Sequence, residues 1–244
     1  MNQLDINSLS SADRHNLVES GLRHGSWSRS CSDETLASMC HDAELRTLRQ
    51  GEVLMHRGET PGRLVIVVKG TIEISTTTQD AKRHVLGFLG DGQIFDLVPF
   101  FDGRSVNYET ITLTDTLVLQ LTRDQVLRLL ASDPGFNLAV IKELCSRARR
   151  SYITLTYTSL LTLKQRCARV IVNLMRDFGE HKDDGIHVPL RLSQETLASV
   201  VGCSRPALNR ELKSLSTDGF ISVTYSHVVV TDKEALTSLA SEDW

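Results

Sequence analysis

The sequence lacks the long apolar run that a membrane-spanning helix requires, since no stretch of its 244 residues approaches about 20 consecutive apolar side chains. It also lacks the pattern of a secretory leader, because residues 1–11 do not combine a basic start with an apolar core. These two absences predict a cytoplasmic protein that has no membrane among its partners.

Neither sign of charge is in large excess, since 27 Lys and Arg residues face 30 Asp and Glu residues and the formal net charge is −3. This balance argues against a protein that coats nucleic acid through bulk positive charge. It is compatible with a local basic surface, because binding depends on where the charges lie. With 41% hydrophobic and 23% charged residues, the composition is that of an ordinary globular protein with room for one large or two small domains.

Cysteine is too scarce and too scattered for a disulfide framework, and no C-x-x-C occurs among Cys31, Cys40, Cys145, Cys167 and Cys203. The spacing of Cys31, Cys40 and His41 is poor for zinc, so no metal site is expected. Free thiols of a reduced cytosol are the favoured interpretation, and a redox or iron–sulfur role is the alternative.

Signatures of catalysis are absent as well. The sequence has no Gly-rich phosphate loop, nucleophile elbow, H-E-x-x-H motif or paired-carboxylate motif. We therefore expect no catalytic residues and no enzyme activity.

Four segments of different texture follow one another. Residues 1–45 are mostly polar with a few apolar residues, and they predict an N-terminal helical extension. Residues 46–133 hold short β-branched or alternating runs, such as 64–68, 71–75, 84–89 and 110–121, separated by glycines. Such runs predict an antiparallel β-roll of jelly-roll type. Residues 134–163 read as one long helix, and residues 164–244 as a second, smaller unit.

The long helix carries an apolar heptad stripe. Ile141, Ala148 and Leu155 fall seven residues apart, with Leu144 in a companion position. A helix of about 28 residues spans about 42 Å, which is too long to be buried in a small domain. We expect a dimer seam between two copies of the chain. The alternative is a helix that packs on its own chain.

A helix-turn-helix pattern lies between Leu192 and Leu215. Ser193 and Ser204 can each cap a helix, because a hydroxyl accepts from the free N–H groups of a first turn. Gly202 can end the first helix in a left-handed conformation. Pro206 is tolerated in the first turn of the second helix, which points its apolar face inward with Leu208, Leu212 and Leu215. Its polar residues are available to solvent, so this helix is able to enter a major groove.

Two further segments complete the C-terminal unit. Residues 219–223 and 227–231 are joined by a short polar turn and predict a β-hairpin wing. Residues 181–185 are rich in turn formers and predict a connector.

The residues of this unit resemble the DNA-binding domain of the Crp/Fnr family of bacterial transcription regulators. The resemblance covers residues 46–231, and it is most specific in residues 201–205 and 209–213. The upstream glycine motifs are similar to the family's cyclic-nucleotide-binding-type roll: Gly51, Gly58-Glu59, Val67-Val68-Lys69-Gly70 and Gly90-Asp91-Gly92. The long helix matches the family's dimerisation helix. The implied fold class is α+β, with an N-terminal β-roll, a long dimerisation helix and a C-terminal winged helix-turn-helix.

The resemblance implies that the second helix reads base edges. Arg210 would grip guanine, Asn209 would pair with adenine, and Arg205 and Lys213 would hold phosphate or guanine. Pro206 stands where much of the family has a glutamate that accepts from cytosine, so the preferred half-site should differ. A dimer should read an inverted repeat with half-sites about 10–10.5 bp apart.

The phosphate cassette of cyclic-AMP-binding members is only partly matched, in residues 94–106. Arg104 and Ser105 survive, but Phe95 replaces a glycine and Asp96 replaces a glutamate. Val106 is larger than the usual Ala or Ser, so we expect an effector other than cyclic AMP. The candidates for effector contact are Asp96, Leu97, Arg104, Ser105, Ser151 and Tyr152. Phe95, Phe100 and Phe101 can line an apolar pocket, although core packing is the favoured interpretation.

The leading hypothesis is a homodimeric transcription regulator whose roll senses an unknown small molecule and re-aims the reading helices. Its expected partners are double-stranded DNA, a second copy of the chain and RNA polymerase. One alternative is a redox, haem or iron–sulfur sensor of the same fold. Another, of a different class, is a nucleotide-binding signalling module that acts through protein contacts. The sequence leaves open the cofactor, the operator and whether the protein activates or represses.

Overall fold

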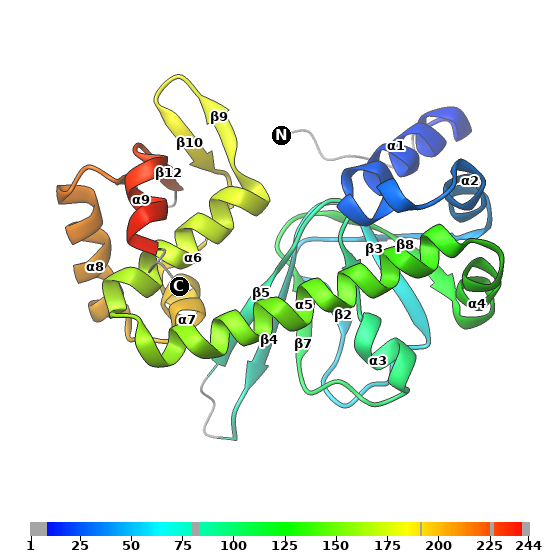
Figure 1. Ribbon diagram of the computed structural model, residues 1–244, viewed down its shortest axis with the longest axis horizontal. Coiled ribbons are helices and arrows are strands. Elements are labelled where there is room, and N and C mark those ends of the chain that lie inside the picture. Colours follow the sequence, from blue (N-terminus) through cyan, green and yellow to red (C-terminus); the bar gives the residue numbers. More distant parts are fainter. Residues whose placement is uncertain (1–8, 80–82, 191, 225–226, 241–244) are drawn as a thin grey trace. The chain divides into compact units, whose positions relative to one another are not determined.

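A computed structural model describes residues 9–79, 83–190, 192–224 and 227–240 of the chain (Figure 1). The chain divides into two compact units. The first unit comprises residues 1–82 and 86–149, and the second comprises residues 83–85 and 150–244. Antiparallel sheets, helices and a C-terminal helix-turn-helix confirm the predicted fold class. Over the described residues, no helix combines the length and the apolar character needed to cross a membrane.

The first unit begins with helices α1 (Ser11–His24) and α2 (Asp33–Asp42), joined by the 3-10 turn η2 (Ser26–Ser30). Ser32 caps α2 with its hydroxyl, which accepts from the Thr35 N–H. Leu22 and Met39 are buried in the core cluster of this unit. The helical character predicted for this segment is thus confirmed, while residues 1–8 of the expected extension lie outside the described residues.

The β-roll consists of two four-stranded sheets. Their strand orders are β1-β8-β3-β6 and β2-β7-β4-β5. Strand β8 pairs antiparallel with β1 and β3, and β7 pairs antiparallel with β2 and β4. The bounds are β1 (Glu44–Leu48), β2 (Val53–Met55), β3 (Arg63–Lys69), β4 (Ile72–Thr77), β5 (Arg83–Leu89), β6 (Ile94–Phe95), β7 (Glu109–Thr112) and β8 (Thr116–Thr122).

One predicted strand is wrong in its extent. The run at residues 110–121 is divided between β7 and β8, and residues 113–115 form a bend between them. The side chain of Thr114 accepts from the Thr71 N–H at 3.0 Å, and Asp115 accepts from the Gln50 N–H at 2.9 Å. Short polar side chains that bond to nearby backbone in this way favour turns over strands.

Two short helices flank the roll, and a long one follows them: α3 (Leu97–Asp102), α4 (Arg123–Ser132) and α5 (Pro134–Leu160). The first turns of α5 belong to the core, since Phe136 and Ala139 are fully buried. The predicted helix at 134–163 is three residues too long. A new helix begins after Thr162, whose hydroxyl accepts from the Gln165 N–H.

The second unit holds helices α6 (Leu163–Phe178), α7 (Gln194–Val201), α8 (Arg205–Thr217) and α9 (Lys233–Ala240). Its sheet has the order β11-β12-β10-β9, built from β9 (Glu180–Lys182), β10 (Gly185–Val188), β11 (Ile221–Thr224) and β12 (His227–Val230). Strands β11 and β12 confirm the predicted wing, whose residues 225–226 are not described. The turn-rich segment predicted at residues 181–185 does form a turn, at residues 183–184, but its ends belong to strands, because it is the tip of the β9–β10 hairpin, where Gly185 pairs with Lys182 at a φ of +137°.

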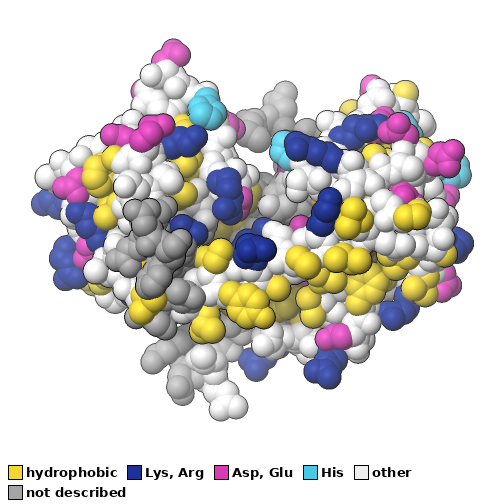
Figure 2. Space-filling view, in the orientation of Figure 1, with side chains coloured by type: hydrophobic (Ala, Val, Ile, Leu, Met, Phe, Trp, Pro, Cys, Tyr) yellow, Lys and Arg dark blue, Asp and Glu magenta, His cyan; other side chains and the backbone are white. Residues whose placement is uncertain are grey.

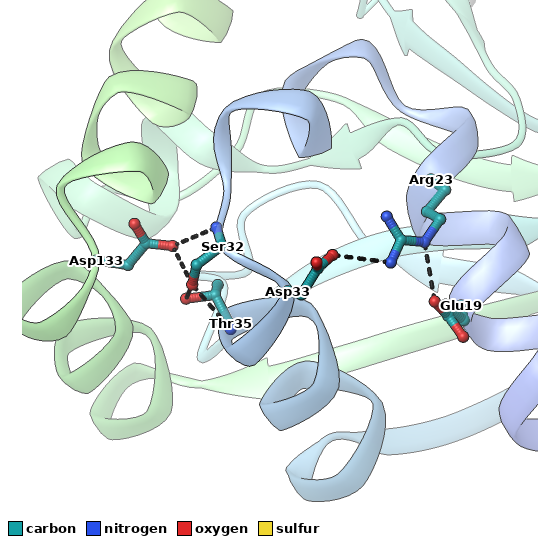
Figure 3. A network of polar contacts seen from close by, with 6 residues as sticks. All are labelled: Glu19, Arg23, Ser32, Asp33, Thr35 and Asp133. Atoms are coloured by element: carbon teal, nitrogen blue, oxygen red, sulfur yellow. Dashed lines mark hydrogen bonds and ion pairs between the residues drawn. The ribbon is translucent and has the colours of Figure 1, made fainter.

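A polar network joins the N-terminal helices to the start of α5 (Figure 3). Asp133, between α4 and α5, accepts from the Ser32 N–H at 2.9 Å, the Ser32 hydroxyl at 3.0 Å and the Gly135 N–H at 2.8 Å. These hydrogen bonds hold the pKa of Asp133 well below its usual range. On the neighbouring helices, Arg23 donates to Glu19 at 2.9 Å and to Asp33 at 3.0 Å.

We predict that Asp133→Ala lowers the free energy of unfolding by about 1–2 kcal/mol at pH 7, because the Ser32 N–H, the Ser32 hydroxyl and the Gly135 N–H lose a charged acceptor. The folded pKa is depressed, so this contribution is present above the unfolded pKa of about 3.9 and is lost as the pH falls below it. Urea unfolding of both proteins at pH 7 and at about pH 2 measures the effect. The exposed Asp183 supplies the control variant, Asp183→Ala, and equal stability of all three proteins at pH 7 would contradict the prediction.

Candidate nucleic-acid interface and sensor site

The helix-turn-helix is built from the capping residues that the sequence indicates. Ser193 accepts from the Thr196 N–H at 3.0 Å at the start of α7, and Gly202 ends that helix in the left-handed region at a φ of +75°. Ser204 caps α8, and Pro206 lies in its first turn. These local interactions fix where both helices begin, and therefore which side chains of α8 face solvent.

The exposed face of α8 carries most of the predicted DNA-contacting residues. Arg205, Pro206, Arg210 and Lys213 are exposed, while Leu208, Leu212 and Leu215 are buried on the opposite side. Asn209 differs, because it is half-buried and its Oδ1 has no hydrogen-bond partner within the described part of the chain. The structure thus brings four of the five predicted residues to one solvent-facing surface, which we call the α8 surface.

Sequence reasoning missed two residues that touch the arginines of the α8 surface. Arg210 Nε donates to Glu211 Oε1 at 3.0 Å, and Arg205 Nε donates to Gln194 Oε1 at 3.3 Å. Glu211 directly follows Arg210 in the sequence, and Gln194 lies eleven residues before Arg205. No sequence spacing signals either contact, since the Arg205–Gln194 contact depends on how α7 and α8 are packed, and the Arg210–Glu211 contact on how the Arg210 side chain bends along α8.

The cysteines are free thiols, and burial makes most of them poor nucleophiles. Burial raises the pKa of Cys31 to about 11 and that of Cys167 to about 12. The pKa values of Cys40 and Cys203 are also raised, again mainly through burial. Because the thiolate is the species that binds metal and reacts with oxidants, these environments do not favour the redox or iron–sulfur alternative.

Within the roll, the residues that match the phosphate cassette are packed by the chain itself. Phe95 is buried in a core cluster with Val65, Val67 and Val118. Its ring lies 6.1 Å from the ring of Tyr108, between centroids. Phe100 is also buried in the core, which confirms the packing interpretation for these two rings. Phe101 is half-buried and contacts Phe100 edge-on.

Asp96 is the most unusual residue of this site. It is 2% exposed and has a positive φ of 59°, a conformation that Asp tolerates better than most residues. Its Oδ1 accepts from the Tyr108 hydroxyl at 2.5 Å, and its Oδ2 has no hydrogen-bond partner among the residues that the structure describes. Burial raises the pKa of Asp96 to about 7, although the Tyr108 hydrogen bond and the charge of Arg147 act in the opposite direction.

The other candidate effector residues do not all share this environment. Leu97 is buried beside Asp96, whereas Arg104 and Ser105 are exposed. Ser151 and Tyr152 are exposed residues of α5 in the second unit. Their role as effector contacts stays a prediction.

Two known families match the two parts of this chain, the roll and the helix-turn-helix. The family model for the cyclic nucleotide-binding domain matches residues 45–133, and that for the Crp-like helix-turn-helix domain matches residues 165–239. The chain belongs to the Crp/Fnr family of transcription regulators. This finding confirms the resemblance read from residues 201–205 and 209–213.

The Crp/Fnr relatives are distant in sequence but are matched over most of their length. The chain is 25% identical over 187 residues to a CRP-like cAMP-activated global transcriptional regulator of Mycobacterium tuberculosis, covering 77% of this chain and 84% of that protein. It is 24% identical over 231 residues to the HTH-type transcriptional regulator Cmr of the same species, covering 91% and 90%. A global nitrogen regulator of Synechocystis is 23% identical over 194 residues, covering 79% and 86%.

Solved structures share the Crp/Fnr fold. FixK2 from Bradyrhizobium japonicum superposes with a TM-score of 0.72 at 17% identity, covering 83% of this chain and 99% of that one. The regulator TTHA1359 from Thermus thermophilus superposes with a TM-score of 0.68 at 20% identity, covering 81% and 98%. With both family models matched, this Crp/Fnr chain is a DNA-binding transcription regulator with a cyclic-nucleotide-binding-type roll.

We predict that Asp96→Asn changes how the stability of this regulator depends on pH. The pKa of Asp96 is raised in the folded state. Its contribution to the free energy of unfolding is therefore fully present below the unfolded pKa of about 3.9, and it is lost as the pH rises toward about 7. The variant has no such proton to lose and should gain about 2 kcal/mol relative to wild type between pH 5 and pH 8.

Urea unfolding at both pH values measures this difference. Asn also tolerates the left-handed backbone, so the substitution tests the charge alone. Asp102→Asn, on an exposed side chain nearby, is the control and should track wild type. Parallel pH profiles for wild type and Asp96→Asn would contradict the prediction.

Proposed function

We propose that this regulator binds double-stranded DNA as a homodimer, at an inverted repeat whose half-sites lie about 10–10.5 bp apart. The observation that carries the proposal is the α8 surface, where Arg205, Arg210 and Lys213 face solvent from a helix whose opposite face is buried. Arginine forks suit guanine O6 and N7 as well as phosphate, and lysine suits phosphate. RNA polymerase is the further macromolecular partner that we propose for a regulator of transcription, and we propose no enzyme activity.

The second copy is supported by the apolar face that α5 leaves open. Ile141 is 56% exposed and Leu155 is 71% exposed. Figure 2 shows apolar side chains gathered along this helix. Ala148 is exposed on the same heptad positions, whereas Leu144 is half-buried and packs against the core of its own unit. An exposed heptad stripe of this kind favours a coiled-coil partner, and an identical helix supplies a matching stripe.

We further propose that the roll senses a signal other than cyclic AMP and passes it along α5 to the α8 surface. In the stretch that matches the phosphate cassette, Phe95 is packed in the core instead of the glycine of cyclic-AMP-binding relatives, and Asp96 already accepts from the Tyr108 hydroxyl. Arg104, which would meet a phosphate in cyclic-AMP-binding relatives, is exposed. The raised pKa values of the cysteines leave a reversibly bound organic effector favoured over a redox or iron–sulfur signal.

DNA selection tests the first proposal. We expect the full-length protein to select an inverted-repeat sequence from a random duplex library. Arg210→Ala should lower affinity for that operator about tenfold and relax the preference at one base of each half-site. Lys213→Ala should weaken binding to all sequences alike and reduce the salt slope by about one. Fluorescence anisotropy at several salt concentrations measures both effects.

The control for DNA binding is Lys233→Ala, on an exposed cation of α9 outside the α8 surface, which should bind like wild type. Wild-type affinity in Arg210→Ala would contradict the assignment of the α8 surface. A full-length protein that selects no DNA sequence would instead support the signalling module that acts through protein contacts.

The dimer proposal predicts that Ile141→Glu and Leu155→Glu each weaken self-association about tenfold or more, because each buries a charge in an apolar seam. Sedimentation equilibrium measures the dimer dissociation constant. Leu127→Glu removes a side chain of similar exposure, 48%, from α4 and should leave the dimer intact. Dimers of unchanged affinity in both α5 variants would place the second copy on another surface.

A further inference from the structure

Both arginines of α8 donate their Nε–H to a side chain that has no role in the proposed DNA contact. Arg210 meets Glu211, which follows it in α8, and Arg205 meets Gln194, at the start of α7. The two acceptors differ in charge and in position along the chain. What the two contacts share is the donor, which is the Nε–H of an arginine in each case.

A hydrogen bond at Nε leaves the two terminal nitrogens of the guanidinium available to bind guanine. Arginine has five N–H donors, of which one is on Nε and four are on the two terminal nitrogens. The terminal nitrogens form the end-on pair that matches guanine O6 and N7. A partner at Nε is able to fix the direction of this pair without competing for it.

Glu211 is well placed to orient Arg210. Its side chain is 14% exposed, whereas that of Arg210 is 73% exposed. Successive residues of a helix do not face each other, so this contact bends the Arg210 side chain along the helix surface toward Glu211. A held acceptor limits the rotamers of a long donor, and side-chain order established before binding lowers the entropy lost on binding.

A carboxylate beside a DNA-reading helix also has a cost. Its negative charge repels phosphate and lowers affinity for every DNA sequence alike. Glu211 therefore works against affinity, and orientation is the benefit that the geometry offers in return.

We propose that Glu211 and Gln194 are positioning residues that orient Arg210 and Arg205 and thereby set the base preference of the regulator. The inference rests on the proposed function, in which the α8 surface reads base edges. It assigns roles to two residues that need not touch DNA.

Two variants at one position separate orientation from charge. Glu211→Ala and Glu211→Gln remove the same negative charge, but only Glu211→Gln keeps an oxygen that accepts from Arg210 Nε. Both variants should bind non-specific DNA more tightly than wild type. At the base read by Arg210, Glu211→Ala should lose about fivefold in preference, and Glu211→Gln should keep the wild-type preference.

The measurement is competition binding between the selected operator and duplexes changed at one base of each half-site. Arg210→Ala identifies the base that Arg210 reads.

A double variant tests whether Glu211 acts through Arg210. Adding Glu211→Ala to Arg210→Ala should cause no further loss of preference at that base, because the residue to be oriented is gone. At the base read by Arg205, Gln194→Ala should lose preference, and Gln194→Glu, which keeps an oxygen acceptor, should retain it.

Thermal unfolding of each variant confirms that α8 is folded, and Glu211→Gln guards against a loss of fold in Glu211→Ala. Identical base preferences in wild type, Glu211→Ala and Glu211→Gln would overturn the inference. A wild-type protein that selects no sequence at all would overturn the proposed function itself, so the two failures are distinguishable.

Discussion

The rest of the first unit depends on how the start of α5 is fixed. Phe136 is fully buried, and the ring of Trp27 meets it edge-on at 6.5 Å between centroids. Trp27 also donates its indole N–H to the Gly92 carbonyl at 2.7 Å, which ties η2 to the roll. Together with the hydrogen bonds of Asp133, these contacts make the N-terminal helices part of the core. They also fix which side of α5 packs on this core, so that Ala139 is buried while Ile141 is exposed to solvent.

The interior of the roll shows how a fold can keep its architecture while its site changes. In the stretch that matches the phosphate cassette, Phe95 is buried in the core and Asp96 accepts from the Tyr108 hydroxyl. Burying an acid with one oxygen unpartnered is unfavourable, and the raised pKa of Asp96 records that cost. A residue kept in this state is responsive to proton concentration or to any ligand that supplies a donor. The fold alone thus does not determine what the roll senses.

Features set by local interactions were predictable from the sequence, and features set by tertiary contacts were not. The caps at Ser193 and Ser204 and the glycine at 202 act within one turn of chain, so the helix-turn-helix could be placed from its residues. The bend at 113–115 depends on bonds to Gln50 and Thr71, and the β9–β10 hairpin is held by the pairing of β10 with the distant β12, which periodicity does not reveal. The half-burial of Asn209 follows from packing around α8 in the same way.

Charge explains why orientation matters more here than in a strongly basic DNA-binding domain. Residues 164–244 hold 10 Lys and Arg residues against 11 Asp and Glu residues, so the C-terminal unit brings no net positive charge to DNA. Non-specific binding grows with the number of phosphates neutralised, and on α8 the cations available for this are Arg205, Arg210 and Lys213. Recognition must then come from a few well-directed donors on α8. An arginine whose side chain is already fixed loses less entropy on binding than a mobile one. A fixed guanidinium also adapts less easily to a wrong base, so it discriminates more strongly against that base. A unit with few cations thus gains specificity by holding each one in place.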